Sequence, residues 1–119
     1  MLFKKHLLHK VLDGSKVQTR RCASKMRYRV GSIQPIKAMY YEKAQGYVQI
    51  KRRFEQRLAD MTEEEAKAEG YENLEAFRKE WPQITKHPLD LKETVTAYEF
   101  HKTEKVRPPF TRGEKNVRE

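Results

Sequence analysis

The sequence lacks the marks of several large protein classes. Cys22 is its single cysteine, which excludes an intrachain disulfide and a cysteine-rich zinc site and fits a reducing cytoplasm, where we expect the protein. No apolar run approaches the roughly 20 residues that a membrane-spanning helix needs, so we expect no membrane partner. Residues 1–12 contain charges and histidines where a secretory signal peptide has an unbroken apolar stretch. Glycine-rich nucleotide loops and internal repeats are also missing.

The length and the charge of the chain suggest one small domain with a polyanionic partner. The 119 residues suffice for a single modest core, and we assign a domain to residues 1–104 and a basic, mobile tail to residues 105–119. The formal net charge is +9. Lysine and arginine release counterions from phosphates, so this charge favours RNA or a nucleotide as partner. A basic protein that is merely well solvated is the alternative.

The charge is unevenly distributed along the chain. Residues 1–30 contain nine lysines and arginines and one acid, Asp13. Residues 60–80 contain eight acids and three basic residues. We therefore expect one positive and one negative part of the surface.

The pattern of apolar residues predicts a helix, four strands, two helices and a final strand. The first helix spans residues 5–13 and ends at Gly14. Strands are predicted over 16–22, 26–30 and 94–102. Residues 33–41 form an edge strand or a loop with a short strand, because Pro35 interrupts them. The spacing in residues 47–58 suits either a helix or a strand, and its β-branched start favours a strand at least through Arg53.

The two later helices have clear start signals. Thr62 and Glu65 form a capping box, and Gly70 ends that helix. Asn73 caps the next helix, which Pro82 is expected to close. Antiparallel strands interrupted by helices predict an α+β fold built on a small β-barrel or half-barrel with flanking short helices.

Three sequence features together are similar to one known family. They are the helix followed by G-x-K-x-x-T-x-R, the alternating segment that leads to Val30 and Gly31, and D-M-T-E-E-E-A-K-A-E-G-Y before a helix containing Trp81. This combination resembles the ASCH domain of the PUA-like superfamily over residues 3–102. The chain departs from the family pattern at Ser32, where an acidic residue commonly follows the glycine, and in the basic tail after Thr103.

The resemblance implies a PUA-like β-barrel with a cleft and an RNA-related function. Some ASCH proteins are amidohydrolases that remove the acetyl group from acetylated cytidine with a lysine, a threonine and a glutamate. By motif, these residues correspond to Lys16, Thr19 and Glu69. Another member is a ribonuclease, and many have no assigned activity, so the resemblance alone does not fix the function.

The chemistry of the first strand is compatible with amide hydrolysis. Thr19 and Arg21 lie two residues apart and point to the same side of a strand, and Lys16 precedes them in a turn. Thr19 would be the nucleophile, Lys16 the base if its pKa is lowered by Arg20 and Arg21, and Arg21 the oxyanion stabiliser. The alternative is an ordinary strand threonine beside a solvated lysine.

Glu69 is expected in the last turn of its helix, where a carboxylate faces the negative end of the helix dipole. A cation such as Lys16 or Arg21 would compensate this charge, and the glutamate would then act as acid or base or orient the lysine. The alternative is a surface glutamate in an acidic helix.

A second group of basic residues is expected to hold an RNA backbone. Alternating positions on adjacent strands would place them beside the cleft, and the group comprises Arg20, Arg21, Lys25, Arg27, Arg29, Lys51 and Arg53. Tyrosine side chains can stack on bases, and four tyrosines are candidates for this role: Tyr28, Tyr40, Tyr41 and Tyr47. The alternative is that these tyrosines belong to the core or its rim.

The remaining chemically interesting residues predict neither a metal site nor a cofactor. His6 and His9 are three apart on a helix without a further ligand at suitable spacing. Cys22 is either reactive beside the arginines or a half-buried strand residue. Leu74, Phe77 and Trp81 are expected in the core. The favoured function is RNA or nucleotide binding; an amidohydrolase, a ribonuclease and a protein-interaction module are the alternatives.

Overall fold

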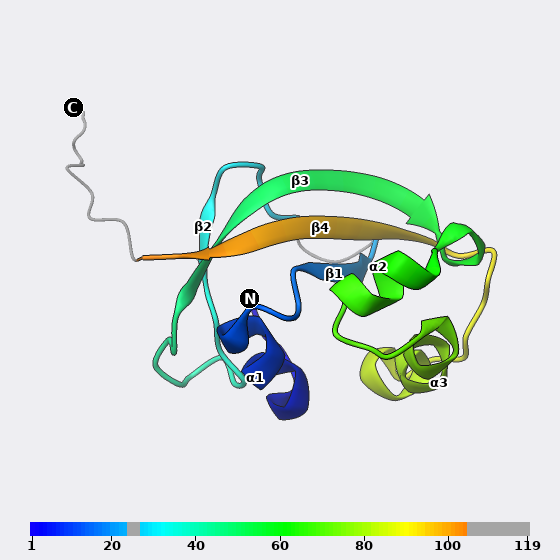
Figure 1. The fold of residues 1–119 in the computed structure, drawn as a ribbon, viewed down its shortest axis with the longest axis horizontal. Coiled ribbons are helices and arrows are strands. Elements are labelled where there is room, and N and C mark those ends of the chain that lie inside the picture. The colour runs from blue at the N-terminus through cyan, green and yellow to red at the C-terminus, as the bar shows by residue number, and fades with distance from the viewer. Residues whose placement is uncertain (24–26, 105–119) are drawn as a thin grey trace.

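The computed structural model describes residues 1–23 and 27–104, which form eight short elements in sequence (Figure 1). They are α1 (Lys5–Asp13), β1 (Gln18–Cys22), β2 (Ile33–Pro35), β3 (Tyr47–Arg57), a 3₁₀ turn (Leu58–Asp60), α2 (Glu63–Ala68), α3 (Leu74–Thr85) and β4 (Thr94–Thr103). The order is the predicted one except for the strand over 26–30: residues 27–30 form none, and Met26 lies outside the described residues. The predicted tail, 105–119, also lies outside them.

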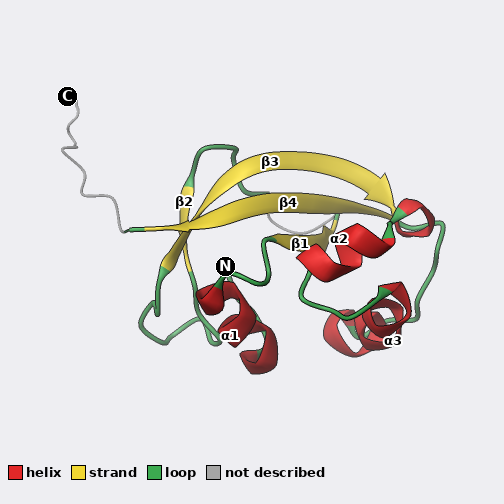
Figure 2. Cartoon of the chain, in the orientation of Figure 1, coloured by secondary structure: helices red, strands yellow, loops and turns green. Residues whose placement is uncertain are grey.

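The four described strands form one open antiparallel sheet in the order β1-β4-β3-β2 (Figure 2). The α+β class is confirmed, and the predicted β-barrel is wrong. Closure would require the sheet edges to meet, but β2 is three residues long and ends in Pro35, which has no N–H for a ladder. Residues 27–30, expected as a strand, instead run beside β3 through isolated contacts, such as Arg53 Nη1 to the Tyr28 carbonyl at 3.1 Å.

A bulge at Lys51 divides the long strand β3 into two parts. Ile50 lies opposite Phe100, whereas Arg52 lies opposite Glu99, so Lys51 has no residue opposite it on β4. An inserted residue bends a strand and increases its twist. In Figure 1, β3 and β4 accordingly arch over the three helices.

The helix boundaries follow the predicted signals at all but one end. Thr62 and Glu65 form the reciprocal capping box of α2, and the Asn73 side chain caps α3. Gly14 ends α1 with a φ of 88°, a left-handed conformation that glycine adopts without strain. The predicted end of α3 at Pro82 is wrong. Pro82 lacks a backbone N–H and crowds the preceding turn, yet α3 continues to Thr85. Beyond the proline the hydrogen bonds resume, since the Lys86 N–H donates to the Pro82 carbonyl at 2.8 Å.

Two apolar clusters lie against the sheet. The first joins the buried face of α1 to β3 and β4 and includes Leu8, Val48, Ile50 and Phe100. The second lies beneath α2 and α3, where Phe77 and Trp81 are core residues as predicted, with Leu74 packed at its margin. None of the helices in residues 1–23 and 27–104 has the length and apolar character that crossing a bilayer requires.

Candidate functional site

Lys16 lies buried at the entrance to β1, with only 2% of its surface exposed. Its ammonium group donates to the carboxylate of Glu69 at 2.8 Å, to the Glu69 carbonyl at 2.9 Å and to the Gln18 carbonyl at 2.8 Å. These three acceptors match the three donors of an ammonium group. Lys16 is therefore a fixed internal charge, and the predicted alternative of a solvated turn lysine is wrong.

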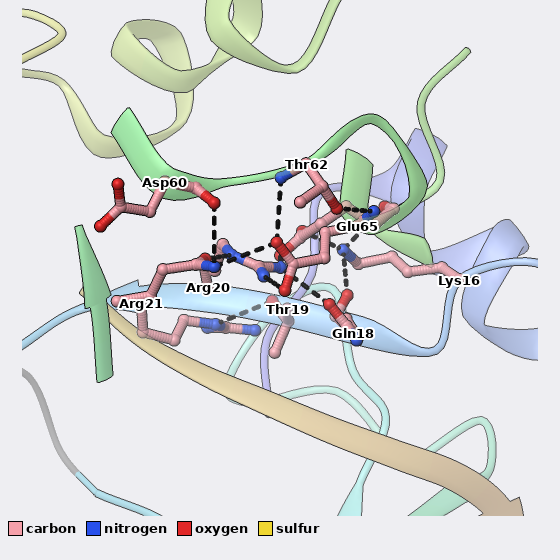
Figure 3. Close-up of polar contacts among 10 residues, drawn as sticks. Lys16, Gln18, Thr19, Arg20, Arg21, Asp60, Thr62 and Glu65 are labelled. Atoms are coloured by element: carbon pink, nitrogen blue, oxygen red, sulfur yellow. Dashed lines mark hydrogen bonds and ion pairs between the residues drawn. The ribbon is translucent and has the colours of Figure 1, made fainter. Parts of the chain in front are cut away.

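Arg20 is the second cation held by Glu69. Figure 3 shows the Arg20 side chain in this network, beside Gln18 and Glu65. Its Nη1 lies 2.9 Å from Glu69 Oε2 and 3.0 Å from Gln18 Oε1, and its Nε donates to Gln56 Oε1 at 3.0 Å. Arg20 Nη2 lies 3.2 Å from Glu65 Oε2 as an ion pair without hydrogen-bond geometry. Two carboxylates thus surround this guanidinium group.

Glu69 bridges both cations because of its place in the fold. It is the C-terminal capping residue of α2 and is 3% exposed, so its carboxylate points from the helix end toward β1. The predicted pairing of Glu69 with Lys16 is confirmed, and Arg20 instead of Arg21 is its second ion-pair partner. The alternative of a surface glutamate is wrong.

The environment of Lys16 lowers its pKa below the usual 10.5. Burial is the largest cause, because removal from water penalises the charged ammonium form. The Glu69 carboxylate opposes this shift, and Arg21 and Arg20 add smaller repulsions. The expected lowering of the Lys16 pKa is confirmed in direction. Its main cause is burial, and the repulsion by the two arginines that we expected contributes less.

Thr19 and Arg21 project from β1 on the side opposite Arg20, because side chains alternate along a strand. Arg21 Nε donates to Thr19 Oγ1 at 3.3 Å, and Arg21 Nη2 donates to the Leu2 carbonyl at 2.9 Å. Among the hydrogen bonds of the described residues, none joins Thr19 Oγ1 to Lys16 Nζ. The predicted nucleophile and base are therefore not hydrogen-bonded to each other.

A cavity of about 710 Å³ lies against β1, the edge strand of the sheet. Its lining includes Lys16, Thr19, Arg20, Arg21 and Glu69 together with residues of α1 and α3. The three residues to which the family motif points thus line one cavity, and Glu69 connects the lysine to the second buried cation.

Neither a family model nor a curated protein sequence matches this chain. Solved structures with a similar fold include the following two proteins. An ASCH domain from Lactobacillus crispatus JV V101 superposes with a TM-score of 0.72 and 12% identity, over 84% of this chain and 72% of that one. The chain has an ASCH-like fold. A protein from Enterococcus faecalis V583, of the family DUF984, superposes with a TM-score of 0.63 and 14% identity, over 83% of this chain and 68% of the other.

The predicted cationic face of this ASCH-like domain is only partly present. Arg27, Arg29, Lys51 and Arg53 are exposed, and we call them the basic patch. Arg20 is 4% exposed, so its expected place on the outer face is wrong: it forms ion pairs inside the protein instead. Arg21 is half-buried against Phe3, and Lys25 lies outside the described residues.

The four tyrosines proposed for base stacking have different environments. Tyr28 lines the cavity and packs edge-on against Tyr98, with ring centroids 5.4 Å apart. Tyr40 and Tyr41 are 81% and 78% exposed, in the loop that follows β2. Tyr47 is half-buried at the start of β3. Tyr28 is thus the one of these four tyrosines that lines the described cavity.

Raising the pH is expected to stabilise the protein through Lys16. Because its folded-state pKa is lowered, the unfolded chain holds this proton more tightly. The free energy of unfolding should therefore increase as the pH rises from the folded-state pKa toward 10.5. Urea unfolding over a pH series measures this slope. The Lys16→Met variant cannot titrate at this position and should show a smaller increase; equal slopes would contradict the prediction.

Proposed function

We propose that this ASCH-like domain binds RNA by placing one nucleoside unit in the cavity against β1. The cavity itself is the observation that carries the proposal. Its volume of about 710 Å³ falls within the usual range of roughly 300–1,000 Å³ for small-molecule sites. Aromatic side chains such as Tyr28 and Tyr71 line it together with the buried charges. Unpaired bases are recognised by aromatic stacking combined with hydrogen bonds to their edges.

The groups that would recognise the nucleoside are the ones whose donors or acceptors are not already used. Lys16 directs all of its donors at Glu69 and Gln18, so its role is to position Glu69. The Thr19 hydroxyl accepts from Arg21 and keeps its own proton available. The Phe100 N–H donates to the Val17 carbonyl just before β1, and the next carbonyl, that of Gln18, accepts from Lys16 instead of β4. By alternation, the backbone N–H and C=O of Arg20 also point away from β4. Thr19 and this strand edge are the proposed contacts.

The basic patch would hold the phosphates on either side of that nucleoside. Tyr28 connects the two regions, because it lines the cavity while its carbonyl accepts from Arg53. A backbone that follows the patch would therefore pass the cavity. Phosphate contacts of this kind position a nucleic acid without reading its sequence.

Removing two of the four cations of the basic patch is expected to weaken RNA binding and its salt dependence together. The double variant Lys51→Gln/Arg53→Gln should lower the slope of log affinity against log salt by about 0.7 for each phosphate that the protein no longer neutralises. Fluorescence anisotropy with a short single-stranded RNA at several salt concentrations measures both effects. The matched control is Lys67→Gln/Lys79→Gln, which removes two exposed lysines of α2 and α3. Equal losses in both variants, or salt-independent binding, would contradict the proposal.

A second candidate function is amide hydrolysis on an acylated nucleoside. The observation that favours it is the lowered pKa of Lys16 beside Glu69, in the cavity that also contains the Thr19 hydroxyl. Lowering the pKa of a lysine toward neutral pH increases the fraction of its neutral amine, the form that can accept a proton as a general base. Arg21 donates to the Thr19 oxygen that would attack. Because Lys16 and Thr19 are not hydrogen-bonded to each other, a water molecule or the substrate must bridge them in this mechanism.

One assay separates the candidate functions. The protein is incubated with acetylated cytidine and, separately, with short single-stranded RNA, and acetate release and strand cleavage are measured. Acetate release that Thr19→Ala abolishes and Glu64→Gln, an exposed control, retains would establish the amidohydrolase. Strand cleavage would establish a ribonuclease, the third alternative. Binding of RNA without either product would leave the binding function.

A further inference from the structure

Three potential metal ligands from distant parts of the sequence meet at the far end of β1. Cys22 is the last residue of β1, His87 lies in the loop after α3, and Glu93 immediately precedes β4. Cys22 Sγ lies 3.3 Å from His87 Nε2, and Glu93 Oε2 lies 4.0 Å from the same nitrogen. The pairing of Cys22 with Val95 fixes the end of β1 against the start of β4. All three residues line the cavity described above.

The arrangement differs from that of a nucleophilic cysteine with a histidine base. In such a triad the third residue would orient the imidazole through the ring nitrogen that does not contact the nucleophile. Here the thiol and the carboxylate both approach His87 Nε2, and the ligand atoms of all three residues lie within 4.8 Å of one another. Three donor atoms gathered around one point are the geometry of a shared cation.

The other ring nitrogen of His87 supports the same interpretation. His87 Nδ1 lies 3.2 Å from the Pro88 carbonyl, which can only accept. The proton is therefore placed on Nδ1, and Nε2 presents its lone pair toward Cys22 and Glu93. Metal-binding histidines commonly donate their second ring N–H to a backbone carbonyl in this way.

The distances and the ligand types fit zinc. Tetrahedral zinc with bonds of about 2.3 Å to sulfur and 2.0–2.1 Å to nitrogen separates these two ligand atoms by roughly 3.5 Å, close to the 3.3 Å between Cys22 and His87. Glu93 would approach by roughly 0.7 Å, which its partly exposed side chain permits. A thiolate and an imidazole also select zinc over magnesium and calcium.

We propose that Cys22, His87 and Glu93 bind one zinc ion, with a fourth coordination position that opens into the cavity. Three protein ligands and one open position are the arrangement of zinc sites that take a water molecule or a substrate group as the fourth ligand. The site involves none of the residues of the Lys16–Glu69–Arg20 network, so its existence does not depend on RNA binding or on hydrolysis.

Cobalt(II) substitution tests the site directly, because thiolate-bound tetrahedral cobalt has a charge-transfer band in the near ultraviolet and intense visible bands. The full chain, freed of metal by a chelator, is titrated with cobalt and then with zinc. We expect one cobalt per chain with the thiolate band, which zinc displaces. Cys22→Ser should abolish the band, and His87→Gln and Glu93→Gln should weaken cobalt binding by more than about tenfold.

Two controls separate this site from incidental metal binding. His101→Gln changes an exposed histidine of β4 that lies outside the cluster, and should leave the titration unchanged. Far-ultraviolet circular dichroism of each variant without metal verifies the fold. The proposal is overturned if folded wild-type protein gives no thiolate band, or if the band survives His87→Gln and Glu93→Gln at wild-type cobalt affinity.

Discussion

Replacing Glu69 with glutamine is expected to lower the free energy of unfolding by about 3–5 kcal/mol, the usual cost of removing one partner from a buried ion pair. Glu69 neutralises two buried cations at once, Lys16 at 2.8 Å and Arg20 at 2.9 Å. Glutamine has almost the same shape, so the loss measures charge rather than packing. Its amide N–H₂ would also replace one of the two carboxylate oxygens, so that either Lys16 or Arg20 would face a donor where it needs an acceptor.

Urea unfolding followed by circular dichroism measures this effect. Glu64→Gln is the matched control, because it removes the same charge from an exposed position of the same helix, and surface changes of this kind usually stay within about 0.5 kcal/mol. A loss of similar size in both variants would mean that Glu69 does not hold the two cations in solution.

Replacing Trp81 with alanine should cost about 3–5 kcal/mol for a different reason, the cavity left in a close-packed core. Trp81 is 2% exposed, and its ring lies 5.5 Å from that of Phe77 in the second apolar cluster. It also lines the cavity against β1, so its removal would enlarge that cavity toward α3.

Thermal unfolding followed by circular dichroism is the suitable measurement, since Trp81 is the only tryptophan and its fluorescence disappears with it. Trp81→Phe retains an aromatic ring and should lose clearly less stability than Trp81→Ala. Tyr40→Ala, at an 81% exposed aromatic residue, should be nearly neutral. If Trp81→Ala were as mild as Tyr40→Ala, the second cluster would not be packed as described.

Local signals predicted the elements of this fold well. The capping residues Thr62 and Asn73 and the terminating Gly14 act through neighbours within a few positions, so the sequence carries them directly. Sheet closure depends instead on how distant segments pair. The alternation around Arg27 and Arg29 resembled a strand, but these residues find only isolated contacts with β3, and the sheet described here stays open.

The candidate site was predictable only in part. The family motif pointed to Lys16, Thr19 and Glu69, and all three line one cavity. The sequence did not predict that Arg20, and not Arg21, would pair with Glu69. That outcome depends on which side of β1 faces the end of α2. The alternation of side chains along a strand is a signal that sequence reasoning could have used. Lys16, Gln18 and Arg20 are two positions apart, so they share one side of an extended segment. The meeting of Cys22 with His87, 65 positions later, has no comparable local signal.

The extra residue in β3 reverses the face of the sheet to which the even-numbered side chains of this strand point. Before Lys51, the even-numbered Val48 and Ile50 pack into the cluster beneath α1. After it, the even-numbered Gln56 lies on the opposite face, where it contacts Arg20 beside α2. Deleting Lys51 would keep every other side chain but turn the second half of the strand over. Arg20 Nε would then lose its hydrogen bond to the Gln56 amide oxygen. The number of residues in this strand, as much as their identity, therefore determines whether a buried cation has an acceptor.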